Sequence, residues 1–222
     1  DDRVREIMTI ANKRNIPMLE IPRSELDRLT DGAVHQGVAM QIPPYKYPDA
    51  TDLVLDTMER WHSGKLSTPP LFVALDGITD PRNLGAIIRS VSAFSGDGVI
   101  IPERRSAAVT AGAWKTSAGA AARIPVAMAT NLTRVIQQAK EQGIFVIGLD
   151  GGGDIELPAL ELANEPLCVV VGSEGKGLSR LVTENCDQIV SIPIDSAMES
   201  LNAAMAVGIT LYDVSRRRAT AN

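Results

Sequence analysis

The sequence predicts an α/β protein built on a parallel sheet, and three observations support that prediction. Short, continuously apolar runs recur after residue 70, and such runs are typical of strands that are buried on both faces. Helical patterns separate the runs, and this alternation indicates a sheet with helices on both sides. The composition, with 45% hydrophobic and 22% charged residues, is that of an ordinary globular protein.

The first 45 residues are expected to be a small and incomplete domain. Such a short segment buries too little surface to form a core alone, so we expect that a preceding strand and helix are missing from this sequence. The predicted elements are a helix at 3–14, a strand at 17–21, a helix opening at Ser24 and a strand at 38–42.

Residues 46–69 are expected to be a linker, because several prolines flank a single helical pattern at 52–61. Residues 70–222 are then the main domain. Its predicted strands are 71–75, 98–101, 145–149 and 167–171, and its predicted helices are 83–95, 107–118, 132–142, 179–184 and 201–217.

The composition excludes several classes of protein. A net charge of −5 argues against a general nucleic-acid coat, so any RNA binding is expected to be local. No apolar run approaches the roughly 20 residues that span a bilayer, and the N-terminus lacks an apolar signal segment, so we expect a cytoplasmic protein with no membrane partner. Two cysteines without CxxC spacing and only two histidines indicate neither a metal site nor a disulfide scaffold.

Ligands of open parallel sheets bind beyond the carboxyl ends of the strands, and the loop after the first strand of the main domain is polar there. It reads DGITDPRNLGAIIR, in which Asn83 is placed to cap the next helix and Arg89 follows six residues later. A capped helix with a solvated arginine is the equally simple structural interpretation.

A second loop, GSEGKGLS, holds three glycines and Glu174. Glycines let backbone N–H groups and a ligand approach each other closely. The spacing matches neither the phosphate loop GxxxxGK[ST] nor the dinucleotide motif GxGxxG, which weakens the hypothesis of a nucleotide-dependent enzyme. A glycine-rich pocket with an acid remains, and a plain turn before a helix is the alternative.

The third polar segment follows SIPI. Ser200 lies where a helix N-cap is expected, and Asn202 is an unusually polar residue before the apolar positions Met205, Ile209 and Tyr212. Capping explains Ser200 but does not readily explain Asn202. A fourth loop, DGGGD at 150–154, is interpreted as a flexible connection.

Together, DPRNLGAIIR, VVGSEGKGLS and SIPI...ESLNAAMAVGITLY resemble the three motifs of the SpoU (TrmH-like) branch of the SPOUT RNA methyltransferases, in the same order and spacing. The short segment HQGV at 35–38 is similar to the end of the ribosomal-protein-L30e-like substrate domain of the family's 23S rRNA guanosine-2'-O-methyltransferases. The resemblance implies a C-terminal deep trefoil knot, a homodimer with its active site at the subunit interface, and bound S-adenosylmethionine.

The resemblance also implies roles for particular residues. The cofactor-holding positions are Gly172, Ile192 and Leu201, and the catalytic and RNA-contacting positions are Asn83, Arg89, Glu174, Ser200 and Asn202. Many members of the family read NVSVA where this chain reads NAAMA, so one hydroxyl is lost at Ala204.

The family assigns the role of base to the arginine, but a guanidinium keeps its proton in proteins. We therefore expect Arg89 to neutralise the developing alkoxide, with Asn83 and Ser200 orienting it and Glu174 sharing the proton. The expected activity is methylation of a ribose 2'-hydroxyl, most simply of a guanosine in 23S rRNA. The alternatives are a tRNA 2'-O-methyltransferase and an inactive RNA-binding homologue.

Overall fold

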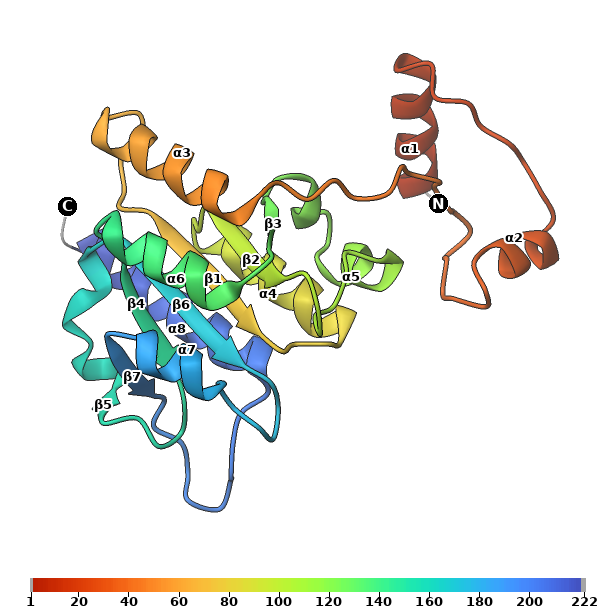
Figure 1. Ribbon diagram of the computed structural model, residues 1–222. Helices are drawn as coiled ribbons and strands as arrows, with labels where there is room; N and C mark the ends of the chain where they lie inside the picture. Colours follow the sequence, from red (N-terminus) through yellow and green to blue (C-terminus); the bar gives the residue numbers. More distant parts are fainter. Residues whose placement is uncertain (1, 221–222) are drawn as a thin grey trace. The chain divides into compact units, whose positions relative to one another are not determined.

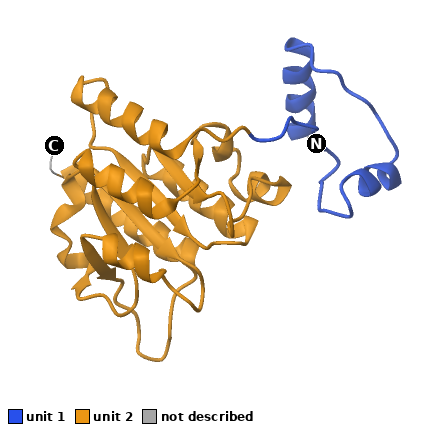
Figure 2. Ribbon diagram, viewed as in Figure 1, with its two compact units in different colours: residues 1–45 blue, residues 46–222 orange. Residues whose placement is uncertain are grey.

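The computed structural model describes residues 2–220, and the chain divides into two compact units, Asp1–Tyr45 and Lys46–Asn222 (Figure 2). The first unit contains the helices α1 (Asp2–Lys13) and α2 (Arg23–Leu29). Among its described residues no strand forms, so the strands predicted at 17–21 and 38–42 are wrong. A strand satisfies its backbone groups by pairing with another strand, and neither segment has a partner within the described part of this unit.

The second unit is built on a seven-stranded sheet in the order β3-β2-β1-β6-β4-β7-β5 (Figure 1). All of its strand pairs are parallel, which confirms the predicted fold class. Four strands match the predicted runs, and the short strands β3, β5 and β7 add to them. The bounds are β1 Leu71–Asp76, β2 Gly98–Pro102, β3 Val126–Ala129, β4 Phe145–Leu149, β5 Ile155–Glu156, β6 Leu167–Gly172 and β7 Gln188–Ser191.

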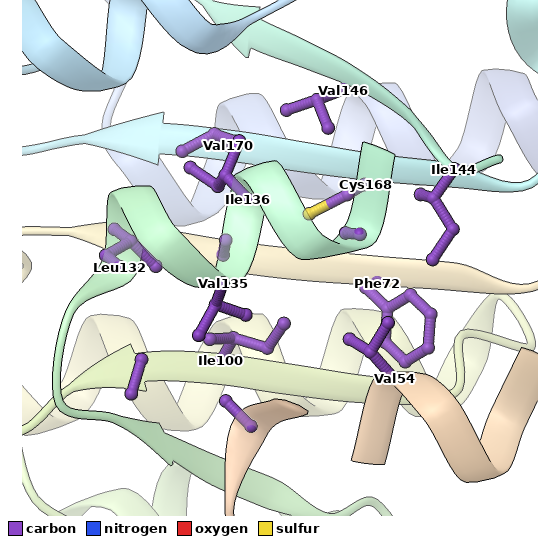
Figure 3. Packing of buried hydrophobic residues seen from close by; sticks show 14 of the residues in the cluster. Val54, Phe72, Ile100, Leu132, Val135, Ile136, Ile144, Val146, Cys168 and Val170 are labelled. Carbon is purple, nitrogen blue, oxygen red and sulfur yellow. The ribbon is translucent and has the colours of Figure 1, made fainter. Parts of the chain in front are cut away.

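One face of the sheet is covered by α3 (Ala50–His62), α6 (Leu132–Glu141) and α7 (Arg180–Asn185). Side chains of these helices and of the central strands form one apolar cluster, in which Phe72, Ile100 and Ile136 are among the large residues (Figure 3). The helix α3 lies in the stretch expected to be a linker, and it contributes Val54 and Met58, each 2% exposed, to this core.

The other face carries α4 (Pro81–Ala93) and α8 (Ala203–Thr220), which pack against each other, with α5 (Ala111–Thr116) beside α4 (Figure 1). Short 3-10 turns complete the connections at Ala120–Ala122, Leu157–Ala159 and Glu161–Asn164. The helix α8 buries Val207, Leu211 and Val214 completely. The apolar positions that the sequence indicates on this helix are instead exposed, with Met205 at 59% and Tyr212 at 56%.

The end of α8 is fixed by a buried arginine. The Arg218 guanidinium donates hydrogen bonds to the carbonyl oxygens of Ala163 (2.8 Å), Pro69 (2.5 Å) and Glu165 (2.6 Å). Burial lowers the pKa of Arg218 to about 10, although Asp97 and Glu165 act in the opposite direction. The side chain therefore stays charged at neutral pH and ties α8 to the segments that precede β1 and β6.

The sheet brings the segments after β1, β6, β4 and β7 to one edge, because all four strands run in the same direction. The motifs singled out in the sequence lie in these segments. No helix of the described residues is long and apolar enough to cross a bilayer.

Candidate active site

Three polar side chains meet at the carboxyl edge of the sheet, one from the first turn of α4, one from the loop after β6 and one from the residue before α8. Asn83 donates a hydrogen bond from Nδ2 to Oε1 of Glu174 (3.1 Å), and Asn202 donates from its own Nδ2 to the same oxygen (2.6 Å). The Asn202 amide also lies 3.0 Å from Oδ1 of Asn83, to which it donates. These residues, called the Asn-Glu-Asn cluster below, join segments that are far apart in the sequence.

Asn83 reaches this cluster because α4 begins two residues before it. The N-cap is Asp80, whose carboxylate accepts a hydrogen bond from the backbone N–H of Arg82 (2.8 Å), and Pro81 occupies the first turn. The expectation that Asn83 caps the helix is therefore wrong. With capping supplied by Asp80, the Asn83 side chain is available to bind Glu174.

Glu174 lies on a tight loop after β6. The backbone N–H of Gly177 donates to the Ser173 carbonyl (2.9 Å) and closes the loop, in which Gly175 (φ +80°) and Gly177 (φ +63°) have left-handed backbone. Glycine adopts this conformation at no steric cost. At the end of the loop, the Asp76 carboxylate accepts from the Ser179 N–H (2.6 Å), so β1 holds the segment in place.

Gly172, expected to approach the cofactor, is buried at the end of β6, and its own loop packs against it. A Cβ at this position would overlap the carbonyl group of Gly177 and the nitrogen of Leu178. Glycine is therefore required here for the loop to fold back over the strand. Any substitution displaces the loop that carries Glu174, whether or not a ligand is bound.

Asn202 has a second role, as the cap of α8. Its Oδ1 accepts hydrogen bonds from the backbone N–H groups of Ala204 (3.0 Å) and Met205 (3.2 Å). The expectation that Ser200 caps this helix is wrong, since Ser200 lies in the exposed loop before α8. Within residues 2–220 the Ser200 hydroxyl has no hydrogen-bond partner. Ala204 is 8% exposed, and the loss of a hydroxyl there leaves the Asn-Glu-Asn cluster intact.

Arg89 is exposed on α4, six residues and about 9 Å along the helix axis from Asn83. In the part of the chain that the structure describes, its guanidinium makes no hydrogen bond or ion pair. The structure thus joins three of the five predicted catalytic residues and leaves Arg89 and Ser200 outside the cluster.

The three residues expected to hold the cofactor lie on neighbouring segments of the same edge. Gly172 ends β6, Ile192 follows β7 directly, and Leu201 precedes Asn202. Ile192 and Leu201 are half-buried. The strand β4 separates β6 from β7 in the sheet, so a bound molecule that touches Gly172 and Ile192 spans the end of β4.

The described residues give little support to thiol or metal chemistry. Both cysteines are free, and burial raises the pKa of Cys168 to about 12 and that of Cys186 to about 11, so neither is a thiolate at neutral pH. No group of three or more histidine, cysteine or acidic residues among those described is arranged to hold a metal ion.

Two carboxylates of this edge, Asp76 and Asp150, are not among the site residues predicted from the sequence. Each directly follows a buried run of its strand, at the position where ligands of parallel sheets bind. That placement was the signal that could have identified them.

Comparison with known proteins identifies the family that the three motifs resemble. The family model described as the SpoU rRNA Methylase family matches residues 70–212, and the one described as RNA 2'-O ribose methyltransferase substrate binding matches residues 1–48. A Mycobacterium avium protein named as an uncharacterized tRNA/rRNA methyltransferase is 56% identical over 218 residues, which cover 98% of this chain and 68% of the relative.

Solved structures show the same fold. The SpoU methyltransferase AviRb from Streptomyces viridochromogenes, in complex with AdoMet (S-adenosylmethionine), has a TM-score of 0.65 and 29% identity, covering 70% of this chain and 63% of its own. The AdoMet-bound rRNA methyltransferase from Sinorhizobium meliloti has a TM-score of 0.73 and 22% identity, covering 97% of this chain and 78% of its own. This chain therefore spans about two thirds of the length of several of the proteins that it matches.

Proposed function

Because this chain belongs to the SpoU rRNA methylase family of AdoMet-dependent RNA methyltransferases, we propose that it methylates the 2'-hydroxyl of a guanosine ribose in 23S rRNA. The choice of a guanosine in 23S rRNA rests on the resemblance of the segment at 35–38 to the substrate domain of 23S rRNA guanosine-2'-O-methyltransferases. The match of residues 1–48 to a substrate-binding family of RNA 2'-O ribose methyltransferases supports the choice of the ribose hydroxyl.

The observation that carries the proposal is the geometry at Glu174. Its Oε1 accepts both asparagine amides, while Oε2 accepts no hydrogen bond from any described residue. Two donors on one oxygen fix the direction of the carboxylate and leave the second oxygen available to a hydroxyl. A carboxylate held in this way can take the proton of a ribose 2'-hydroxyl as the oxygen attacks a methyl carbon.

Gly172, Ile192 and Leu201 would hold the methyl donor, whose sulfonium supplies the methyl group. The fit rests on this edge of the sheet, where loops follow three adjacent strands and where an added Cβ at Gly175 or Gly151 meets no atom within 4 Å. No described residue therefore covers the loops at these two positions.

Arg89 is proposed to act on the RNA. A guanidinium with no partner among residues 2–220 is available to a backbone phosphate and to the alkoxide that forms on the ribose. The homodimer is part of the same proposal, because a second subunit or the RNA would supply the contacts that orient Arg89. The exposed apolar row Met205, Ile209 and Tyr212 on α8 supports such an interface.

The trefoil knot stays a proposal as well. It is supported by the match of residues 70–212 to the SpoU family model.

The test is methylation of 23S rRNA fragments and of total tRNA with isotope-labelled AdoMet, followed by mass-spectrometric mapping of the product. We expect 2'-O-methylguanosine in a 23S fragment and no product when that nucleotide is replaced by its 2'-deoxy form. Methylation of tRNA alone would favour the tRNA alternative. AdoMet binding without any methyl transfer would identify an inactive RNA-binding homologue.

A further inference from the structure

Asp150 occupies a central position at the carboxyl edge of the sheet. It directly follows β4, whose last residue, Leu149, is in register with Val171 of β6 on one side and Val190 of β7 on the other. The backbone N–H of Asp150 donates to the Val190 carbonyl (3.1 Å), so this residue continues the ladder with β7. Asp150 therefore lies between Gly172 and Ile192, the two positions proposed to flank the methyl donor.

The Asp150 side chain is held over the neighbouring loop. Its Oδ1 accepts a hydrogen bond from the Gly152 N–H (2.9 Å). Its Oδ2 lies 3.0 Å from the place that a Cβ of Gly177 would occupy. Within residues 2–220 Oδ2 accepts no hydrogen bond. One oxygen is thus used to orient the carboxylate, and the other faces the space between the loops that follow β4 and β6.

Given the methyltransferase function proposed above, we propose that the Asp150 carboxylate accepts hydrogen bonds from the ribose hydroxyls of AdoMet. An ionised carboxylate only accepts hydrogen bonds, and a vicinal diol offers two O–H donors. An acidic residue at the carboxyl edge of a parallel sheet has this same role toward a ribose in dinucleotide-binding folds.

The order of the strands indicates that Asp150 binds the ribose of AdoMet and not its charged sulfur. The reactive methyl must point at the Asn-Glu-Asn cluster, which lies at the ends of β1 and β6. β4 is the next strand after β6, about 5 Å further along the edge. The ribose is bonded to the sulfur through one methylene carbon, which is short enough to bring its hydroxyls within reach of Asp150, and it carries the neutral donors that a carboxylate accepts.

The test is isothermal calorimetry with AdoMet and with S-adenosylhomocysteine, on the wild type, on Asp150→Asn and on Asp154→Asn. The asparagine keeps the shape and an oxygen for the Gly152 N–H but removes the charge. Asp154 is an exposed carboxylate of the same loop and serves as the matched control. We expect Asp150→Asn to bind both ligands about tenfold more weakly, because charge-assisted hydrogen bonds are roughly twice as strong as neutral ones, and Asp154→Asn to bind like the wild type.

Ligands that lack one ribose hydroxyl complete the experiment. Removal of a ribose hydroxyl, as in 2'-deoxy or 3'-deoxy S-adenosylhomocysteine, and the substitution Asp150→Asn should each reduce the binding free energy. For at least one of the two analogues, we expect the combined loss to be smaller than the sum of the two separate losses. Full additivity for both analogues, or a loss with AdoMet but not with S-adenosylhomocysteine, would overturn the assignment to the ribose. Unchanged affinity in Asp150→Asn would overturn it as well and leave the proposed function standing. A wild type that binds neither ligand would instead contradict the proposed function itself.

Discussion

A 2.6 Å hydrogen bond from Nδ2 of Asn202 to Oε1 of Glu174 connects the start of α8 to the glycine-rich loop after β6. The other end of the same amide caps α8 through the N–H groups of Ala204 and Met205. One side chain therefore serves both the stability of a helix and the orientation of the proposed proton acceptor, and substitutions can separate these two roles.

Asn202→Ser should separate them. Serine is as good an N-cap as asparagine, so we expect the free energy of unfolding to change by less than about 0.5 kcal/mol, whereas the amide donors to Glu174 and Asn83 are lost. Asn202→Ala should lose the cap too, at a cost of about 1 kcal/mol. Both variants should be slow in single-turnover methylation, and chemical denaturation should distinguish them. A serine variant with normal turnover would show that the amide does not orient Glu174 for the reaction.

Glu174→Gln tests the proton acceptor directly. Glutamine has the same shape and keeps an acceptor oxygen for the two asparagines, but it cannot take a proton. We expect the single-turnover rate at saturating AdoMet to fall by about 10²- to 10⁴-fold, the usual contribution of a general base, with little change in AdoMet affinity. The control is Glu199→Gln, an exposed glutamate in the loop before α8. A rate within a few-fold of the wild type would remove Glu174 from this role.

Gly172→Ala should damage the fold of the loop as well as the site. The added methyl group overlaps the Gly177 main chain, and overpacking of this kind costs about 1–3 kcal/mol. Thermal unfolding and calorimetry should therefore show lower stability together with weaker AdoMet binding. An alanine variant as stable as the wild type would mean that the loop moves away from β6 at no cost.

The sheet was predictable where strands are long and buried on both faces, as in β1, β2, β4 and β6. The remaining strands carry weaker signals. β5 has only two residues, and β7 owes its place to pairing with β4 on one side and β5 on the other. In the first unit strands were predicted where none forms, because the local pattern indicated strands that have no partner among the described residues.

The site was predictable as a set of loops but not as a network. The motifs identified Asn83, Glu174 and Asn202, yet the helix starts were assigned to Asn83 and Ser200 rather than to Asp80 and Asn202. Several polar residues near a helix start are all acceptable caps by propensity. Which of them caps depends on where the backbone turns, and this in turn decides which side chain remains for chemistry.

The proposed homodimer predicts an effect of charge on the exposed face of α8. Met205 is 59% exposed, and four to seven residues further along the helix Ile209 and Tyr212 extend the apolar row. A glutamate at the centre of an apolar interface would be buried without a partner. We expect Met205→Glu to shift the protein from dimer to monomer in light scattering, while Glu141→Gln, on the exposed end of α6, leaves the mass unchanged. A wild type that is monomeric at working concentration would contradict the dimer.

Arg89 is the residue for which a structural and a functional role differ most in their consequences. Because the exposed guanidinium makes no contact within the described chain, Arg89→Ala should change the free energy of unfolding by no more than about 0.5 kcal/mol. If Arg89 balances charge on the ribose oxygen, turnover should fall by about 10² or more with AdoMet affinity unchanged. Arg89→Lys should restore little of the lost turnover, since an ammonium lacks the planar fork that spans a hydroxyl and a phosphate.

Arg134→Ala, on the exposed side of α6, is the matched control. Single-turnover methylation with saturating AdoMet measures all three variants, and an Arg89→Ala rate within a few-fold of the control would make Arg89 an ordinary surface residue.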